Sequence, residues 1–132
     1  MSKHETPMTR AFWKTVGGTL VEEFCAVRRS ETCGQRLIDG LILPNQETKR
    51  VKGSDFDEKE IEGEDIIIIQ AKATRLGMYL MGQTLFSAEL MKKFNPKTIL
   101  SVALVLQDDS ILRPILEDYP NMKVVILDKY ES

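Results

Sequence analysis

Histidine is almost absent from this chain: His4 is the only one among 132 residues. A Ser-His-Asp triad, a histidine-rich metal site or a histidine general base would each need that one residue, so these chemistries are nearly excluded. Any catalysis is therefore expected to use carboxylates, lysine and a hard metal ion that prefers oxygen ligands.

Cysteines and long apolar runs are also scarce. Cys25 and Cys33 are the only cysteines, and without nearby histidines they predict two reduced thiols rather than a zinc site or a disulfide. No apolar run is long enough to cross a bilayer, and residues 1–10 lack the apolar core of a signal peptide. We therefore expect a cytoplasmic protein with no membrane contact, folded as a single domain over residues 1–132.

Charge of either sign is not in large excess. The formal net charge is −2. This balance argues against broad, purely electrostatic binding to nucleic acid, but it is compatible with a local basic groove.

Two apolar segments with polar interruptions predict the centre of the fold. Residues 65–72 contain four consecutive isoleucines, which are typical of a strand buried on both faces, and end in Gln70, Ala71 and Lys72. Because side chains alternate along a strand, Gln70 and Lys72 project from the same face. Residues 36–44 form a second aliphatic run, interrupted by Asp39 and a glycine, and a carboxylate there is costly unless it is paired, hydrogen-bonded or metal-bound.

The other segments predict an α/β fold with a mixed sheet flanked by helices. A helical spacing of apolar residues begins after Thr6-Pro7 and continues to Val27, interrupted by Gly17-Gly18, and it places Glu22 on this first helix. Residues 45–64 predict a solvated loop or an extended hairpin, or alternatively a mobile flap. A helix over residues 78–94, apolar around most of its circumference, precedes a strand over 98–106, a short helix to 116 and a strand over 122–127.

The two interrupted strands, placed side by side, bring complementary groups together. Asp39 meets Gln70 and Lys72, and Glu22 can reach the same place. Hydrolysis of a phosphodiester needs a metal ion at the scissile phosphate and positive charge near the reacting groups. Carboxylates of Asp39 and Glu22, the amide of Gln70 and the Ala71 carbonyl are oxygen ligands suited to Mg²⁺ or Mn²⁺, and Lys72 supplies the charge.

This pattern resembles the PD-(D/E)XK nuclease superfamily over roughly residues 18–94. The matching residues are Ile38-Asp39 followed by Gly-Leu-Ile-Leu, and Gln70-Ala71-Lys72 after the isoleucines, with glutamine at the usual acidic position as in the Mrr-like branch. Gly18 and Glu22 are similar to the first-helix glycine and glutamate of small resolvases. The segment from Gln83 to Ala88 is similar to the glutamine-bearing helix of RecB-type nucleases, with Ser87 in place of the usual tyrosine.

The resemblance implies a restriction-endonuclease-like core and a metal-dependent deoxyribonuclease. Asp39, Gln70, Lys72 and Glu22 would form the catalytic site, Asp39, Glu22, Gln70 and Ala71 would hold the metal, and Arg75 and Gln83 would contact DNA. A domain of this size has little surface for gripping a duplex, so a homodimer or a partner subunit is expected.

Two alternatives remain open at this point. The same fold can serve as a non-catalytic subunit that binds nucleic acid or protein. In an unrelated α/β protein, Lys72 would form a structural ion pair with Asp39 or Glu22, because such networks imitate active sites.

Overall fold

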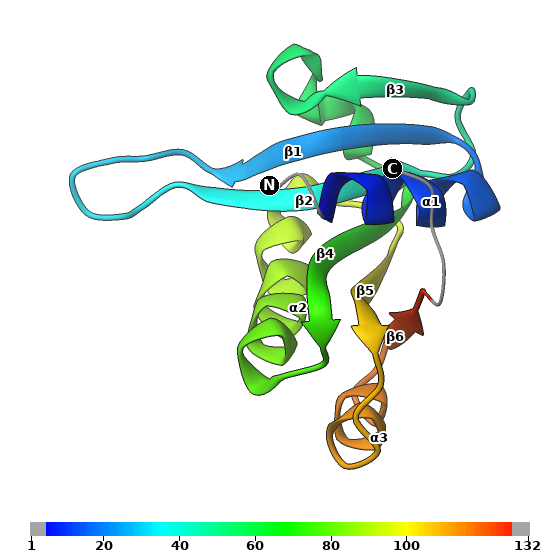
Figure 1. The fold of residues 1–132 in the computed structure, drawn as a ribbon. Helices are drawn as coiled ribbons and strands as arrows, with labels where there is room; N and C mark the ends of the chain where they lie inside the picture. The colour runs from blue at the N-terminus through cyan, green and yellow to red at the C-terminus, as the bar shows by residue number, and fades with distance from the viewer. Residues whose placement is uncertain (1–4, 128–132) are drawn as a thin grey trace.

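The chain alternates helices and strands in the computed structural model, which describes residues 5–127 (Figure 1). His4 lies outside the described residues. In chain order the elements are α1 (Glu5–Val16), β1 (Thr19–Val27), β2 (Arg36–Leu43), β3 (Lys49–Lys52), the 3-10 turns η1 (Gly53–Asp55) and η2 (Glu58–Ile61), β4 (Asp65–Arg75), α2 (Met78–Met91), the 3-10 turn η3 (Lys92–Phe94), β5 (Thr98–Gln107), α3 (Leu112–Glu117) and β6 (Met122–Ile126). The α/β class predicted from the sequence is confirmed.

The six strands within residues 5–127 belong to one mixed sheet with the order β3-β1-β2-β4-β5-β6. The pairs β1–β2 and β2–β4 are antiparallel, whereas β1–β3, β4–β5 and β5–β6 are parallel. The isoleucine strand β4 lies near the middle, as its continuous apolar run predicts. Its side chains alternate between the two faces, with Ile68 packed on one and Ile69 on the other.

Helices cover both faces of the sheet. Helix α1 packs Met8, Phe12 and Trp13 over one face. Helices α2 and α3 cover the other face, where Leu80, Met91 and Leu116 are buried. Figure 1 shows α1 across β2 and β4, and α2 beside β4 on the other side of the sheet.

The prediction of one helical segment continuing to Val27 is wrong. Helix α1 ends at Val16, Gly17 and Gly18 have φ values of 85° and 78°, and the chain then enters β1. Glu22 therefore lies on a strand and not on a helix. A four-residue spacing of apolar groups fits a strand as well as a helix, and the β-branched and aromatic residues of β1 favour the strand.

The segment over residues 45–64 is more ordered than the predicted loop or hairpin. It contributes the edge strand β3, which pairs in parallel with β1 and so does not form a hairpin with it. Ile61, at the end of η2, is fully buried and anchors the acidic part of this connection to the core.

Helix α2 is less buried than the sequence predicts. The predicted span is observed as α2 followed by η3. However, its apolar circumference is not covered on all sides, because Met78, Tyr79 and Phe86 are exposed large side chains.

Gly18 gives the clearest stability prediction. A Cβ there would overlap the carbonyl oxygen of Leu43, and the positive φ adds backbone strain. We expect Gly18→Ala to lower the free energy of unfolding by about 2–4 kcal/mol in denaturant titration. The control Gly82→Ala, in the middle of α2 with open space around its Cβ position, should raise it by about 0.5–1 kcal/mol. Equal effects of the two changes would contradict this account.

Candidate functional site

Asp39 lies where β2 separates from β4. The β2–β4 ladder pairs Ile42 with Ile67 and ends at Gly40 with Ile69. At the next position the Asp39 side chain takes the place of a backbone carbonyl of β2 as the acceptor. Its Oδ2 accepts a hydrogen bond of 2.9 Å from the Ala71 backbone N–H. Figure 1 shows β4 curving away from the β1–β2 hairpin in this region. Two motifs 32 residues apart in the sequence thus meet at a single contact.

A second carboxylate accepts a hydrogen bond from another β4 amide that has no partner on β2. Glu5, at the start of α1, accepts a hydrogen bond of 3.2 Å from the Ala73 N–H through its Oε2. Amides of alternate residues point to the same side of a strand, so the Ala71 and Ala73 amides both face the space that β2 has left. Buried amides need acceptors, and two acidic side chains supply them.

In β1 and β2 the alternation of side chains between the two faces of the sheet is interrupted next to Asp39. Val21 and Phe24, three residues apart, pack in the same core cluster, and so do Ile38 and Leu41. Strict alternation would put residues three apart on opposite faces. The β1–β2 ladder omits the pair of Glu23 and Asp39, and Glu23 has a φ of 55°. The register is the same on either side of this omitted pair, so the Glu23 and Asp39 positions still lie opposite one another.

The surroundings of Asp39 disfavour its charge. Burial raises the pKa of the Asp39 carboxyl, the hydrogen bond from Ala71 partly opposes that rise, and the negative charges of Glu5 and Glu23 raise the pKa further. No lysine or arginine within residues 5–127 forms an ion pair with it. A cation at this position would relieve the electrostatic cost.

Gln70 and Lys72 lie on the α2 side of β4. The side chain of Ala71 between them packs into the α1-side core, and Gln70, which is 6% exposed, donates a hydrogen bond of 2.8 Å from Nε2 to Ser87 Oγ on α2. This bond leaves the amide oxygen of Gln70 available as an acceptor. Lys72 is exposed and has no ion-pair partner in the described part of the chain. The alternative of a structural ion pair to Asp39 or Glu22 is therefore not what the structure shows.

Glu22 is held away from this group. Its carboxylate accepts hydrogen bonds from Arg10 Nε at 2.9 Å and Arg10 Nη2 at 3.2 Å, and Arg50 Nη1 lies 3.8 Å from its Oε1. The Glu22 side chain is 15% exposed and lines a groove of about 410 Å³ beside α1. Gln70 lines a different groove, on the α2 side. The two arginines neutralise Glu22, so this conformation does not leave it available to a metal.

The two residues expected to contact DNA have different surroundings. Arg75 is exposed at the end of β4 and donates a hydrogen bond of 2.7 Å from Nη1 to the Asp108 carbonyl. Gln83 is exposed on α2 and lines the same groove of about 740 Å³ as Gln70. The fold therefore brings Gln83 and Gln70 to one groove.

Sequence reasoning did not assign a role to Glu5 or Glu23. Glu5 precedes Ala73 by 68 residues and belongs to no recognisable motif, so no local signal identifies it. Glu23 is adjacent to Glu22, and a helical interpretation of this segment gives no reason to choose between the two. The strand alternation of β1 would have separated the two glutamates.

A divalent metal ion at Asp39 would need several oxygen ligands. Among residues 5–127, no three histidine, cysteine, aspartate or glutamate side chains are grouped so that they could hold an ion. Mg²⁺, however, is commonly held by one or two carboxylates together with water and substrate phosphate. The Ala71 carbonyl faces the same side of β4 as its N–H, toward Asp39. Asp39, this carbonyl and the amide oxygen of Gln70 are the oxygen donors that such a site would use.

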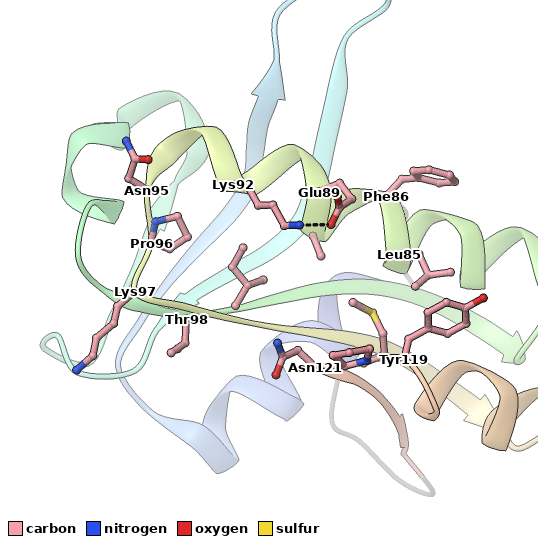
Figure 2. A pocket seen from close by; sticks show the side chains of 14 residues that line it. Leu85, Phe86, Glu89, Lys92, Asn95, Pro96, Lys97, Thr98, Tyr119 and Asn121 are labelled. Carbon is pink, nitrogen blue, oxygen red and sulfur yellow. Dashed lines mark ion pairs between the residues drawn. The ribbon is translucent and has the colours of Figure 1, made fainter.

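A further groove lies elsewhere. It measures about 930 Å³ and runs between the second half of α2, the start of β5 and the turn before β6. Figure 2 shows Phe86 and Tyr119 near its rim and the ion pair of Glu89 with Lys92, whose atoms are 2.7 Å apart. Two of its charged side chains, Glu89 and Lys92, already neutralise each other. The groove is lined neither by Asp39 nor by the Gln70–Lys72 motif, so it is separate from the candidate site.

Comparison of the chain with protein-family models, with curated proteins and with solved structures finds no match. Over residues 5–127, the helices are too short or too polar to span a bilayer.

The raised pKa of Asp39 predicts how stability depends on pH. The pKa of Asp39 in the folded protein lies above the unfolded value of about 3.9. As the pH rises from the unfolded pKa through the folded pKa, the carboxyl ionises more readily in the unfolded chain, so the free energy of unfolding decreases. The whole decrease is present at neutral pH. Asp39→Asn keeps an acceptor for the Ala71 amide without the charge. We expect it to raise the free energy of unfolding by about 0.5–2 kcal/mol at pH 7.5, measured by denaturant titration, with the difference disappearing below about pH 4.

Asp39→Ala serves as the matched control. It removes both charge and acceptor, and it should lower stability by about 1–3 kcal/mol relative to Asp39→Asn, because the Ala71 amide is then left without a partner. Identical stabilities of the two variants would contradict the hydrogen-bonding role given to Asp39.

Proposed function

We propose that this protein is a divalent-metal-dependent nuclease that hydrolyses phosphodiester bonds in DNA. The observation that carries the proposal is the contact of Asp39 with the Gln70–Lys72 motif, through the hydrogen bond from Ala71 N to Asp39 Oδ2. The resemblance to the PD-(D/E)XK superfamily rests on these same residues. The mixed sheet with helices on both faces is compatible with the core that this resemblance implies.

In this proposal each residue has a separate task. Asp39, with the Ala71 carbonyl and the amide oxygen of Gln70, holds the metal, and Ser87 fixes the orientation of that amide by accepting its N–H. A bound Mg²⁺ or Mn²⁺ would polarise the scissile phosphate and lower the pKa of water. The ammonium group of Lys72 is not neutralised by a carboxylate in the described chain, so it is available to stabilise the negative charge that develops on the phosphoryl oxygens.

The reaction consumes one water molecule. The water oxygen forms a bond to phosphorus, the bond from phosphorus to one sugar oxygen breaks, and that oxygen leaves with a proton as a hydroxyl group. The raised pKa of Asp39 implies that acid conditions protonate the carboxyl and reduce its affinity for a cation. Cleavage is therefore expected to fall as the pH decreases.

The direct test is cleavage of single-stranded, duplex and branched DNA in the presence of Mg²⁺ or Mn²⁺. We expect Asp39→Asn and Lys72→Met each to reduce the cleavage rate by about 100-fold or more, because each removes a charge that acts at the reacting phosphate. Lys123→Met is the matched control, since Lys123 is also an exposed strand lysine but lies on β6, two strands from β4. Its activity should remain near that of the unmodified protein. Full activity in both site variants would refute the proposal.

A second candidate function, a non-catalytic subunit with a nuclease-like fold, is favoured by the state of Glu22. Its pairing with Arg10 and Arg50 removes from the expected metal site the second carboxylate that the sequence predicted there. Calorimetric titration with Mn²⁺ separates the two functions. Binding that is lost in Asp39→Asn supports the nuclease, whereas no heat of binding from a folded protein, together with no cleavage, supports the non-catalytic subunit.

A further inference from the structure

The groove lined by Gln70 has two unlike walls. The start of β2 forms one wall and the outer face of α2 forms the other, with Gln70 between them. The residues used here are Arg36 and Gln35 from the first wall, and Met78, Tyr79, Gln83 and Phe86 from the second. The groove of about 740 Å³ therefore runs from Gln70, one residue of the candidate site, along the length of α2.

The α2 wall has three large apolar side chains that are mostly exposed to solvent. Tyr79 is 82% exposed, Met78 76% and Phe86 70%. Single exposed apolar residues are normal, but neighbouring ones on one helix face mark binding surfaces. Aromatic rings stack on nucleic-acid bases irrespective of sequence, because every base has a π-face. Base faces become available only where the strand is unpaired.

The charges near the groove suit a phosphate backbone. Arg36 lines the groove, Lys72 follows Gln70 on the same side of β4, and Arg28 and Arg29 lie in the hairpin loop that leads into β2. All four are exposed, and none forms an ion pair within residues 5–127. Much of the acidic excess lies at the other end of β4, in the segment from Asp55 to Asp65. Arg36 in the groove and Lys72 next to Gln70 thus supply positive charge at this side of the molecule, although the net charge of the chain is −2.

We infer that this groove binds an unpaired stretch of the DNA substrate, with bases against Tyr79 and Phe86 and phosphates toward Arg36 and Lys72. The inference rests on the proposed function and specifies its substrate as single-stranded DNA or a single-stranded part of a branched molecule. The exposed amides of Gln35 and Gln83 supply donors and acceptors for base edges. A second copy of the chain fits less well, because two-fold pairing of this face would bring the same unpaired cations together.

The test is binding, measured by fluorescence anisotropy in EDTA so that no cleavage occurs. The probes are a labelled 20-nucleotide single strand and a duplex of the same sequence. We expect the single strand to bind at least about tenfold more tightly, and Tyr79→Ala to weaken its binding about tenfold, as stacking energies indicate. Arg36→Gln should reduce the slope of log K against log salt concentration by about 0.7.

Tyr119→Ala is the matched control, because Tyr119 is an exposed tyrosine that lines the other groove (Figure 2). Unchanged single-strand binding in this variant supports the inference. Equal binding of single strand and duplex, or equal losses in the two tyrosine variants, overturns it. A dimer that Tyr79→Ala converts to a monomer in sedimentation, with DNA binding unaffected, also overturns it and assigns the face to self-association.

The result separates the inference from the function on which it rests. Selective single-strand binding without cleavage in Mg²⁺ or Mn²⁺ removes the nuclease but leaves the groove assignment. Metal-dependent cleavage that is lost in Asp39→Asn but unaffected in Tyr79→Ala, with no preference for single strands, leaves the nuclease and removes the groove assignment.

Discussion

The hydrogen bond from the Ala71 amide to the Asp39 carboxylate is the constraint around which the centre of this protein is arranged. Strand β4 extends past the point where β2 leaves it, and the buried backbone amides that lose their ladder partners there need other acceptors. Acidic side chains meet this need without continuing the sheet, and Glu5 does the same at Ala73. The two carboxylates thus keep the separation of the strands from leaving the Ala71 and Ala73 amides unsatisfied.

The same arrangement explains why stability and proposed function oppose each other at Asp39. Burial and two neighbouring glutamates make the negative charge unfavourable in the folded protein. A chain selected only for stability would place a neutral acceptor there. A carboxylate kept charged against its surroundings is the kind of group that a cation would stabilise, and sites of this kind commonly store such strain.

The sequence predicted the central strands well and the edge of the sheet poorly. The four isoleucines of β4 and the branched residues of β2 specify two buried strands that are neighbours in the sheet, and the Asp39 carboxylate accepts a hydrogen bond from the Ala71 amide, between Gln70 and Lys72. The prediction of a helix through Glu22 was wrong because apolar residues four apart fit the period of a strand as well as that of a helix. The turn at Gly17 and Gly18 ends the helix, and the chain continues as β1. The polar strand β3 has a single apolar residue, Val51, so its place in the sheet depends on pairing with β1 and not on its own pattern. The contact of Glu5 with Ala73 spans 68 residues and has no local signature.

Strand β3 also has a consequence for the behaviour of the protein in concentrated solution. It forms one border of the sheet, and three of its four residues, Lys49, Arg50 and Lys52, are cationic. An uncovered border is a template on which another polypeptide can add a strand, and fibrous aggregates grow in this way. Charged side chains on an edge strand disfavour the addition of a strand from a neighbouring molecule, because their charges would have to lose water. This short strand therefore helps to keep the sheet from extending from one molecule to the next.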